Sequence, residues 1–280
     1  MKPLISAQDL DLVQHLPPAP TVLVELLDLF KDEDRDLDRA IELINHDPAL
    51  TSEILKCCNS SYFGARQRVG DMFEAVSMLG FYEVYRIVVA MVGSQVAGLT
   101  VATTALDISA LWEHSVWSAE AAGIIARHTG EDQSLAFTAG LLHDVGKVVL
   151  AAARPELYER ISMLIGEVLT EREEEAFGVN HAAVGAQIFA RWALPTSVIA
   201  AVGQHHALDE GHPFPELAAA VHVADVIAHR LVSGPECGVV EKPEFMEILR
   251  LTPDNLTGLM EQVAERADSV KQLIGAMAPA

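Results

Sequence analysis

Apolar residues recur at spacings of three and four along most of the chain, which is the pattern of amphipathic helices. The pattern is clear in segments 22–30 and 37–44, and it continues in alanine-rich stretches at 118–128, 182–192 and 216–232. The sequence contains no sustained alternation of apolar and polar residues and no internal repeat. These patterns predict an all-α fold, a multi-helix bundle in which small side chains let the helices pack closely.

Two positions carry signals for the start of a helix. Asp47 precedes Pro48, and Thr252 precedes Pro253. A short polar side chain at the N-cap, followed by proline in the first turn, is typical of a helix N-terminus. We therefore expect one helix to begin near residue 48 and another near residue 253, the second extending to about residue 274.

The helical periodicity is interrupted once, at residues 97–107. This stretch, AGLTVATTALD, places glycine and β-branched residues between two strongly periodic blocks. Such residues weaken helices and often mark connections between structural units. The interruption predicts two parts: an N-terminal helical subdomain over 1–100 and a second helical part over 101–280.

Composition and charge narrow the possible partners. Half of the residues are apolar, which excludes an acidic disordered chain, and 19 basic against 40 acidic residues give a net charge of −21. This charge argues against binding to nucleic acid or to an anionic membrane surface. Apolar runs such as 87–92 are too short to span a bilayer, and the N-terminus lacks a signal-peptide pattern. With only three cysteines and no disulfide framework, we expect a cytoplasmic protein.

Candidate chemistry is concentrated in the second part of the chain. Imidazole and carboxylate are ligands that divalent iron, manganese and zinc accept. The candidates form an ordered series: His114, His143, Asp144, His181, His205, His206 and Asp225. Six further histidines are scattered along the chain, so spacing alone leaves open both a metal site and ordinary core or surface histidines. The acidic run 171–175 is expected to be a solvated helix face.

Several segments resemble the HD superfamily of phosphohydrolases. The run AGLLHDVGKVVL (139–150) is similar to the histidine-aspartate signature of that superfamily, LWEHSVWSA (111–119) to its first histidine element, and HVADVI (222–227) to its final aspartate. More narrowly, the chain resembles the HD-related output domain, HDOD, of bacterial signalling proteins. The matching pieces are LPPAP (16–20), INHDPALTSEILKCCNSSYFG (44–64), AVSMLGF (75–81), NHAAVGAQIFARWALP (180–195) and the double histidine of GQHHAL (203–208). The resemblance implies an HD-like core with an N-terminal helical subdomain.

The resemblance also implies a metal site. His114, His143, Asp144 and Asp225 match the mononuclear HD ligand set. His181, His205 and His206 match additional ligands of the HD-GYP class, which are phosphodiesterases that open cyclic di-GMP. One or two divalent ions, of iron or manganese, are therefore expected. Asp144 and Lys147 match catalytic positions, where the carboxylate would position a nucleophile and the ammonium would offset phosphate charge. Without this resemblance, Lys147 is equally well interpreted as a surface residue at a helix end.

The sequence departs from the HD-GYP class after the double histidine. Ala207 occupies the position of a glutamate, the stretch 211–215 replaces the GYP loop, and Ala110 occupies the position of a further carboxylate ligand. Two functions remain open. The first, which we favour, is a regulatory module that binds metal and acts through a signalling protein partner. The alternative is a metal-dependent phosphohydrolase or phosphodiesterase acting on a cyclic dinucleotide or another small phosphorylated ligand.

Overall fold

The computed structural model describes residues 21–29, 37–59, 69–98, 105–234, 237–239 and 241–277. In these residues all regular structure is helical, which confirms the all-α prediction. The N-terminal helices are α2 (Thr21–Leu29), α3 (Leu37–Asn45), α4 (Pro48–Cys58), α5 (Met72–Leu79) and α6 (Phe81–Gly98). The central helices are α7 (Ile108–Thr129), α8 (Gln133–Leu142), α9 (Val145–Ala153), α10 (Pro155–Tyr158), α11 (Gly166–Phe177), α12 (His181–Arg191), α13 (Thr196–Gly203) and α14 (Pro215–Ser233). The chain continues into α15 (Pro243–Ile248), α16 (Pro253–Ala264) and α17 (Ala267–Met277).

Both predicted helix starts are confirmed. The Asp47 carboxylate accepts a hydrogen bond of 3.0 Å from the Leu50 amide, and Thr252 forms a capping box at the start of α16. The expected single helix to residue 274 is wrong, because the chain turns between α16 and α17. At this turn the Arg266 guanidinium pairs with Glu83, which lies on α6. The apolar periodicity runs through the turn and does not mark it, whereas Arg266 at the turn contacts residues of both α6 and α7.

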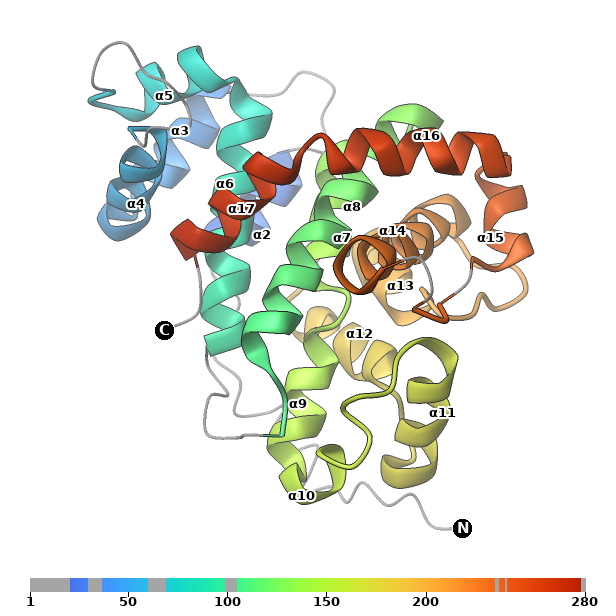
Figure 1. The fold of residues 1–280 in the computed structure, drawn as a ribbon. Coiled ribbons are helices and arrows are strands. Elements are labelled where there is room, and N and C mark those ends of the chain that lie inside the picture. The colour runs from blue at the N-terminus through green and yellow to red at the C-terminus, as the bar shows by residue number, and fades with distance from the viewer. Residues whose placement is uncertain are drawn as a thin grey trace.

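Helices α7, α8 and α14 form the centre of the molecule. Helix α7 packs along both α8 and α14, and it also contacts α6, α16 and α17 (Figure 1). The stretch Gln133–Ala153 is long and apolar enough to span a membrane by composition alone, but 83% of its apolar window is buried inside the protein. It comprises α8 and α9, separated by His143 and Asp144. These central helices hold the candidate ligands.

Helix α6 joins the N-terminal helices to this centre. It contacts α7, α8, α9 and α17, while α2, α4 and α5 pack against it (Figure 1). The Tyr85 side chain of α6 is buried, and its hydroxyl group lies 2.5 Å from the hydroxyl of Thr138 on α8. Helix α6 ends at Gly98 and α7 begins at Ile108, and residues 99–104 between them lie outside the described part. The division into two parts at residue 100 stays a prediction. The LPPAP segment also lies outside it.

We expect the isolated fragment 105–280 to be poorly soluble or partly unfolded. Removal of α6 would expose the apolar surfaces of α7 and α8 against which it packs, including the surface around Thr138 that Tyr85 covers. Thermal unfolding followed by circular dichroism, with the full chain as reference, measures the effect. A fragment that unfolds cooperatively with the stability of the full chain would show that the two predicted parts are independent.

Candidate metal centre

All seven predicted ligands converge on one region of the core. His114 comes from α7, His143 and Asp144 separate α8 from α9, His181 is the first residue of α12, and Asp225 lies within α14. The double histidine follows the end of α13. Six of the seven side chains are buried, and His206 is partly exposed. The ordered series is therefore a spatial cluster.

Four ligand atoms form a first cluster. His114 Nε2 lies 2.9 Å from Asp225 Oδ1 and 3.4 Å from His143 Nε2. His143 Nε2 is 3.4 Å from Asp144 Oδ2 and 3.7 Å from Asp225 Oδ1. Around a metal with bonds of about 2.0–2.2 Å, neighbouring ligand atoms lie roughly 2.9–3.6 Å apart. The donor spacing of the first cluster therefore suits a single divalent ion.

The second cluster uses the other oxygen of the same aspartate. Asp144 Oδ1 lies 3.2 Å from His181 Nε2, which in turn lies 2.9 Å from His206 Nε2. His205 completes the group, with its ligand atom within 4.8 Å of those of His181 and His206. Because a carboxylate has two separate acceptor oxygens, Asp144 faces both clusters at once.

The hydrogen bonds around the histidines direct lone pairs into the clusters. His143 and His205 each donate Nδ1–H to the backbone carbonyl three residues earlier, at 2.7 Å. His181 Nδ1 lies 2.6 Å from a carboxylate oxygen of Glu173. These bonds leave each Nε2 unprotonated in the neutral ring, as metal ligation requires. Two buried atoms, Asp144 Oδ1 and His205 Nε2, have no hydrogen-bond partner among the described residues, so the donor set fits divalent cations.

The two aspartates are negatively charged in the folded protein. Burial alone would favour neutral carboxyl groups, but His143 and Lys147 outweigh it and hold the pKa of Asp144 well below its usual range. The pKa of Asp225 is likewise lowered well below its usual range, against the effect of burial, by neighbouring imidazoles. Both aspartates are therefore available as charged oxygen ligands for a cation.

The histidines differ in their protonation. Burial lowers the pKa of His205 and His206 well below the usual range, so both rings are neutral at pH 7. Burial acts in the same direction on His143, but Asp144 and Asp225 outweigh it and raise the pKa of His143 to about 10. In the absence of a metal, a proton therefore occupies His143. Since a metal must displace this proton, the affinity of the protein for the metal should increase with pH.

Local sequence explains how α9 and α12 approach so closely. A Cβ atom at Gly146 would overlap the backbone carbonyl of His181, so only glycine fits where these helices meet. Asn180 caps α12, its side chain accepting a hydrogen bond of 3.0 Å from the Ala183 amide. Gly146 and this cap together place His181 beside Asp144.

The backbone of the double histidine is held by two residues from elsewhere in the chain. His222 Nδ1 lies 2.9 Å from the His205 carbonyl oxygen, and the Lys242 ammonium donates to the His206 carbonyl oxygen at 2.5 Å. His222 is also linked to Lys242, whose backbone N–H donates to His222 Nε2 at 3.2 Å. These contacts fix the turn that follows α13.

The interpretation of segment 171–175 as a solvated face is wrong for Glu173, although its four neighbours in the run are exposed. Glu173 is 0% exposed, and its carboxylate also accepts hydrogen bonds from the His181 backbone amide at 2.8 Å and from the Tyr158 hydroxyl at 3.1 Å. A signal existed in the sequence: Glu173 lies four residues from Leu169 and from Phe177, which share its buried face.

A second residue that the sequence pattern does not identify is His229, one of the six scattered histidines. It lies one helical turn after Asp225 on α14, and its Nε2 is 3.3 Å from Asp225 Oδ1. The His229 ring also packs on the His114 ring, with centroids 4.3 Å apart. The i, i+4 spacing on one helix is the signal that could have identified it.

Replacing Glu173 with glutamine is expected to lower metal affinity by about 10- to 100-fold, because His181 loses the carboxylate that orients its ring and increases its basicity. Glutamine keeps the size of the side chain and one acceptor oxygen, which limits the loss of stability. Competition with a chelator measures the affinity. Glu171→Gln, an exposed position on the same helix, is the matched control. Equal affinities in the two variants would remove Glu173 from the site.

Lys147 is not a surface residue. Its side chain is 12% exposed, and its ammonium donates to Asp144 Oδ2 at 2.6 Å. Lys147 therefore neutralises part of the charge of Asp144 from the first turn of α9. To contact a phosphate, this ammonium would have to share or leave that carboxylate.

The clusters are accessible from one side. A cavity of about 270 Å³ is lined by His206, His222 and Asp225, together with residues 165–168 and residues 238–239 and 241–243. Lys242 lies in its wall and pairs with Glu167 at 2.5 Å. Because two candidate ligands line this cavity, a small molecule that enters it would lie beside the two clusters.

The HDOD domain family model matches residues 16–208. This chain belongs to the HDOD family. An uncharacterized protein of Treponema pallidum (strain Nichols) is 30% identical to this HDOD protein over 213 residues, which are 73% of the chain and 40% of the relative. A ribonuclease Y of Campylobacter hominis is 28% identical over 194 residues, which are 68% of the chain and 31% of the relative. The HDOD chain thus spans less than half the length of these curated relatives.

A solved structure supports the fold of the HDOD protein. A proposed signal transduction protein of Marinobacter aquaeolei superposes with a TM-score of 0.79 at 22% sequence identity, covering 96% of this chain and 61% of the other. At this identity the likeness extends to the arrangement of helices. It agrees with the prediction of an HD-like helical core preceded by an N-terminal helical part.

Proposed function

We propose that this chain is a regulatory HDOD protein of bacterial signalling whose core holds two divalent metal ions. The observation that carries the proposal is the position of Asp144, whose two oxygens face two separate groups of histidines. One of these oxygens is buried without a hydrogen-bond partner. Burial removes hydration from this oxygen, and a cation would compensate for that loss better than the His181 imidazole 3.2 Å away.

The residues divide naturally between the two ions. The first ion would be held by His114, His143, Asp225 and Asp144 Oδ2. The second ion would be held by His181, His205, His206 and Asp144 Oδ1. Mixed nitrogen and oxygen donors suit iron or manganese. When bound, the ions would supply positive charge that stabilises the folded core and, where a coordination position stays open, Lewis acidity.

In this role the metal centre serves stability and the response to a signal, while a signalling protein partner receives the output. The net charge of −21 favours a protein partner over nucleic acid or an anionic membrane. Cys57 and Cys58 are free thiols, which is consistent with the reducing cytoplasm as the site of action.

A metal-dependent phosphohydrolase is the second candidate, and the cavity beside His206 and Asp225 favours it. A relative named ribonuclease Y adds support for action on a phosphodiester. In this candidate, Asp144 would orient the nucleophile, and Lys147 would offset the charge that develops on the phosphate. Against it, Ala207 and segment 211–215 replace the loop of the cyclic di-GMP phosphodiesterases that the sequence resembles.

Assays of turnover separate the two candidates. With iron or manganese supplied, we expect no hydrolysis of cyclic di-GMP or of bis(p-nitrophenyl) phosphate above the rate of a His143→Ala control. Metal analysis of the same wild-type preparation, purified without added metal, should nevertheless find bound metal. A metal-dependent rate that disappears in the control would establish the phosphohydrolase. Wild-type protein that binds no metal would contradict both candidates.

A further inference from the structure

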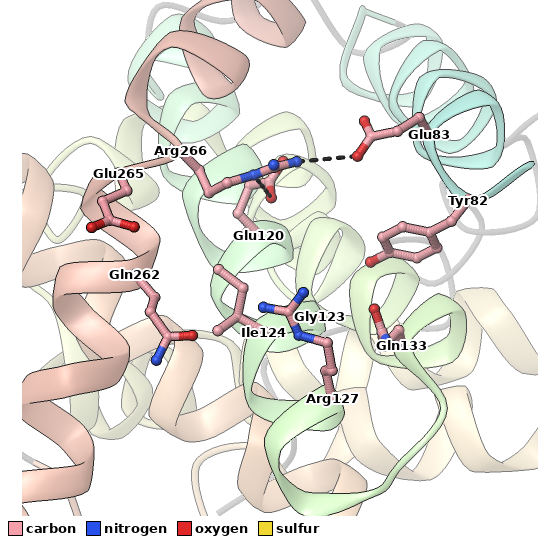
Figure 2. A pocket seen from close by; sticks show the side chains of 10 residues that line it. All are labelled: Tyr82, Glu83, Glu120, Gly123, Ile124, Arg127, Gln133, Gln262, Glu265 and Arg266. Atoms are coloured by element: carbon pink, nitrogen blue, oxygen red, sulfur yellow. Dashed lines mark hydrogen bonds and ion pairs between the residues drawn. The ribbon is translucent and has the colours of Figure 1, made fainter. Parts of the chain in front are cut away.

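A second cavity lies away from the metal centre, where helices α6, α7, α8 and α16 meet. Figure 2 shows the side chains that line this cavity, and its volume is about 230 Å³. Its floor is α7 at Gly123 and Ile124, and polar side chains surround this floor. The side chains come from three regions that are distant in sequence. The lining residues are Tyr82, Glu83, Glu120, Gly123, Ile124, Arg127, Gln133, Gln262, Glu265 and Arg266.

On one wall of this cavity, acidic and basic side chains neutralise each other. Arg86, which is 1% exposed, binds Glu83 through two hydrogen bonds of 2.6 and 2.7 Å and also pairs with the buried Glu120. Arg266 reaches across from the turn after α16 to Glu83 at 3.1 Å, and its Nε lies 3.8 Å from Glu120 (Figure 2). Two arginines thus balance two glutamates, so this wall has no net charge to attract a ligand.

The remaining polar side chains are unpaired. In the described part of the chain, the Tyr82 hydroxyl, the Arg127 guanidinium and the amides of Gln133 and Gln262 form no hydrogen bond or ion pair. Burial raises the pKa of Tyr82 to about 12, so its hydroxyl remains protonated and can donate. A Cβ atom at position 123 would lie 2.6 Å from this hydroxyl, so the glycine allows Tyr82 to rest against α7.

We propose that this cavity binds a small organic anion, a carboxylate or a phosphate ester, with Arg127 as its anchor. A guanidinium matches either anion through two parallel hydrogen bonds. Tyr82, Gln133 and Gln262 supply further donors around the rim, and the floor accommodates an apolar body. Glu265 is the lining carboxylate for which the described structure shows no basic partner. Its negative charge repels an anion and lowers the affinity of the cavity for it.

The location suggests how such an anion would act. Helix α7 carries His114 near its start and Arg127 near its end, about 20 Å apart at 1.5 Å per residue. Helix α8 begins at Gln133 and ends beside His143. The cavity also contacts α6 and the turn after α16. A bound anion would therefore connect the N-terminal helices, the C-terminal helices and the two helices that present metal ligands.

The test is calorimetric titration of the full chain with AMP, succinate and inorganic phosphate. We expect AMP or succinate to bind more tightly than inorganic phosphate, because only the organic anions can use the floor and the amides. Arg127→Gln should weaken this binding at least tenfold. Glu265→Gln should strengthen it a few-fold by removing repulsion. Arg172→Gln, another exposed helix arginine, is the matched control and should bind as wild type does.

Several outcomes would overturn the proposal. These are the absence of binding by all three probes at millimolar concentration, and equal binding by Arg127→Gln and wild type. The second result would place the anion elsewhere, for instance at the metal centre. Weaker binding by Glu265→Gln would show that the Glu265 carboxylate contributes to binding instead of opposing it, which contradicts the proposed selection for an anion. Since Arg127 is exposed, its variant should fold; thermal unfolding checks this, and Tyr82→Phe provides an independent lining variant that should also weaken binding.

Discussion

Replacing Asp144 with alanine is expected to remove nearly all bound metal from the purified protein. The reason is that Asp144 contributes an oxygen to each cluster, so its loss disrupts both. His114→Ala should affect mainly the first cluster, and His206→Ala mainly the second, each leaving about half of the wild-type metal. Elemental analysis of protein purified without added metal measures the stoichiometry. Asp268→Ala, an exposed position on α17, is the control.

The alanine variant also leaves the Lys147 ammonium without its carboxylate, which destabilises the fold. Asp144→Asn keeps the shape of the side chain and should show a similar loss of metal with less unfolding. Wild-type metal content in the folded asparagine variant would contradict the shared role of Asp144. Equal losses in the Asp144 and His206 variants would indicate a single ion.

Stripping the metal is expected to lower the melting temperature by several degrees. Metal that binds only the folded state contributes its binding free energy to folding, and about 1–3 kcal/mol is sufficient for a shift of this size. Without the metal, Asp144 and Asp225 remain charged and buried with weaker compensation. Calorimetry before and after dialysis against a chelator measures the shift.

Addition of manganese or iron should restore the original melting temperature. A His143→Ala protein, treated with the chelator in the same way, should show little further change because it already lacks the metal. If wild-type protein released its metal and kept its melting temperature, the ions would have no structural role. The centre would then have to be explained by catalysis or by binding of a substrate.

Much of the helical fold could be predicted from periodicity, because apolar residues of helices such as α3 recur at spacings of three and four and form one buried face. The break between α16 and α17 could not, since neither proline nor glycine lies at residues 264–267, and the contacts of Arg266 there are with residues on α6 and α7. Local sequence has no access to such contacts. The same limit applies to the cavity at Gly123, whose walls come from separate parts of the chain.

The candidate site was predictable as a set of ligands but not as a complete network. The histidine and aspartate positions follow from the resemblance to HD proteins, and the structure brings all of them together. Glu173 could not be identified from the sequence because its neighbours in the acidic run are charged and exposed to solvent. Charge alone does not distinguish a buried carboxylate from an exposed one. His229 was hidden because scattered histidines are common. Burial, which decides both cases, depends on tertiary packing.

The ligands are spread from residue 114 to residue 225, with α8 to α13 between them. No short segment of the chain can therefore assemble either cluster, and α14 must dock on α7 before Asp225 meets His114. Ions would be captured late in folding, after the long loop has closed. Once bound, they would tie together distant segments as a cross-link does. Their release would then require a partial opening of the helical core, and the rate of metal exchange would report on that opening.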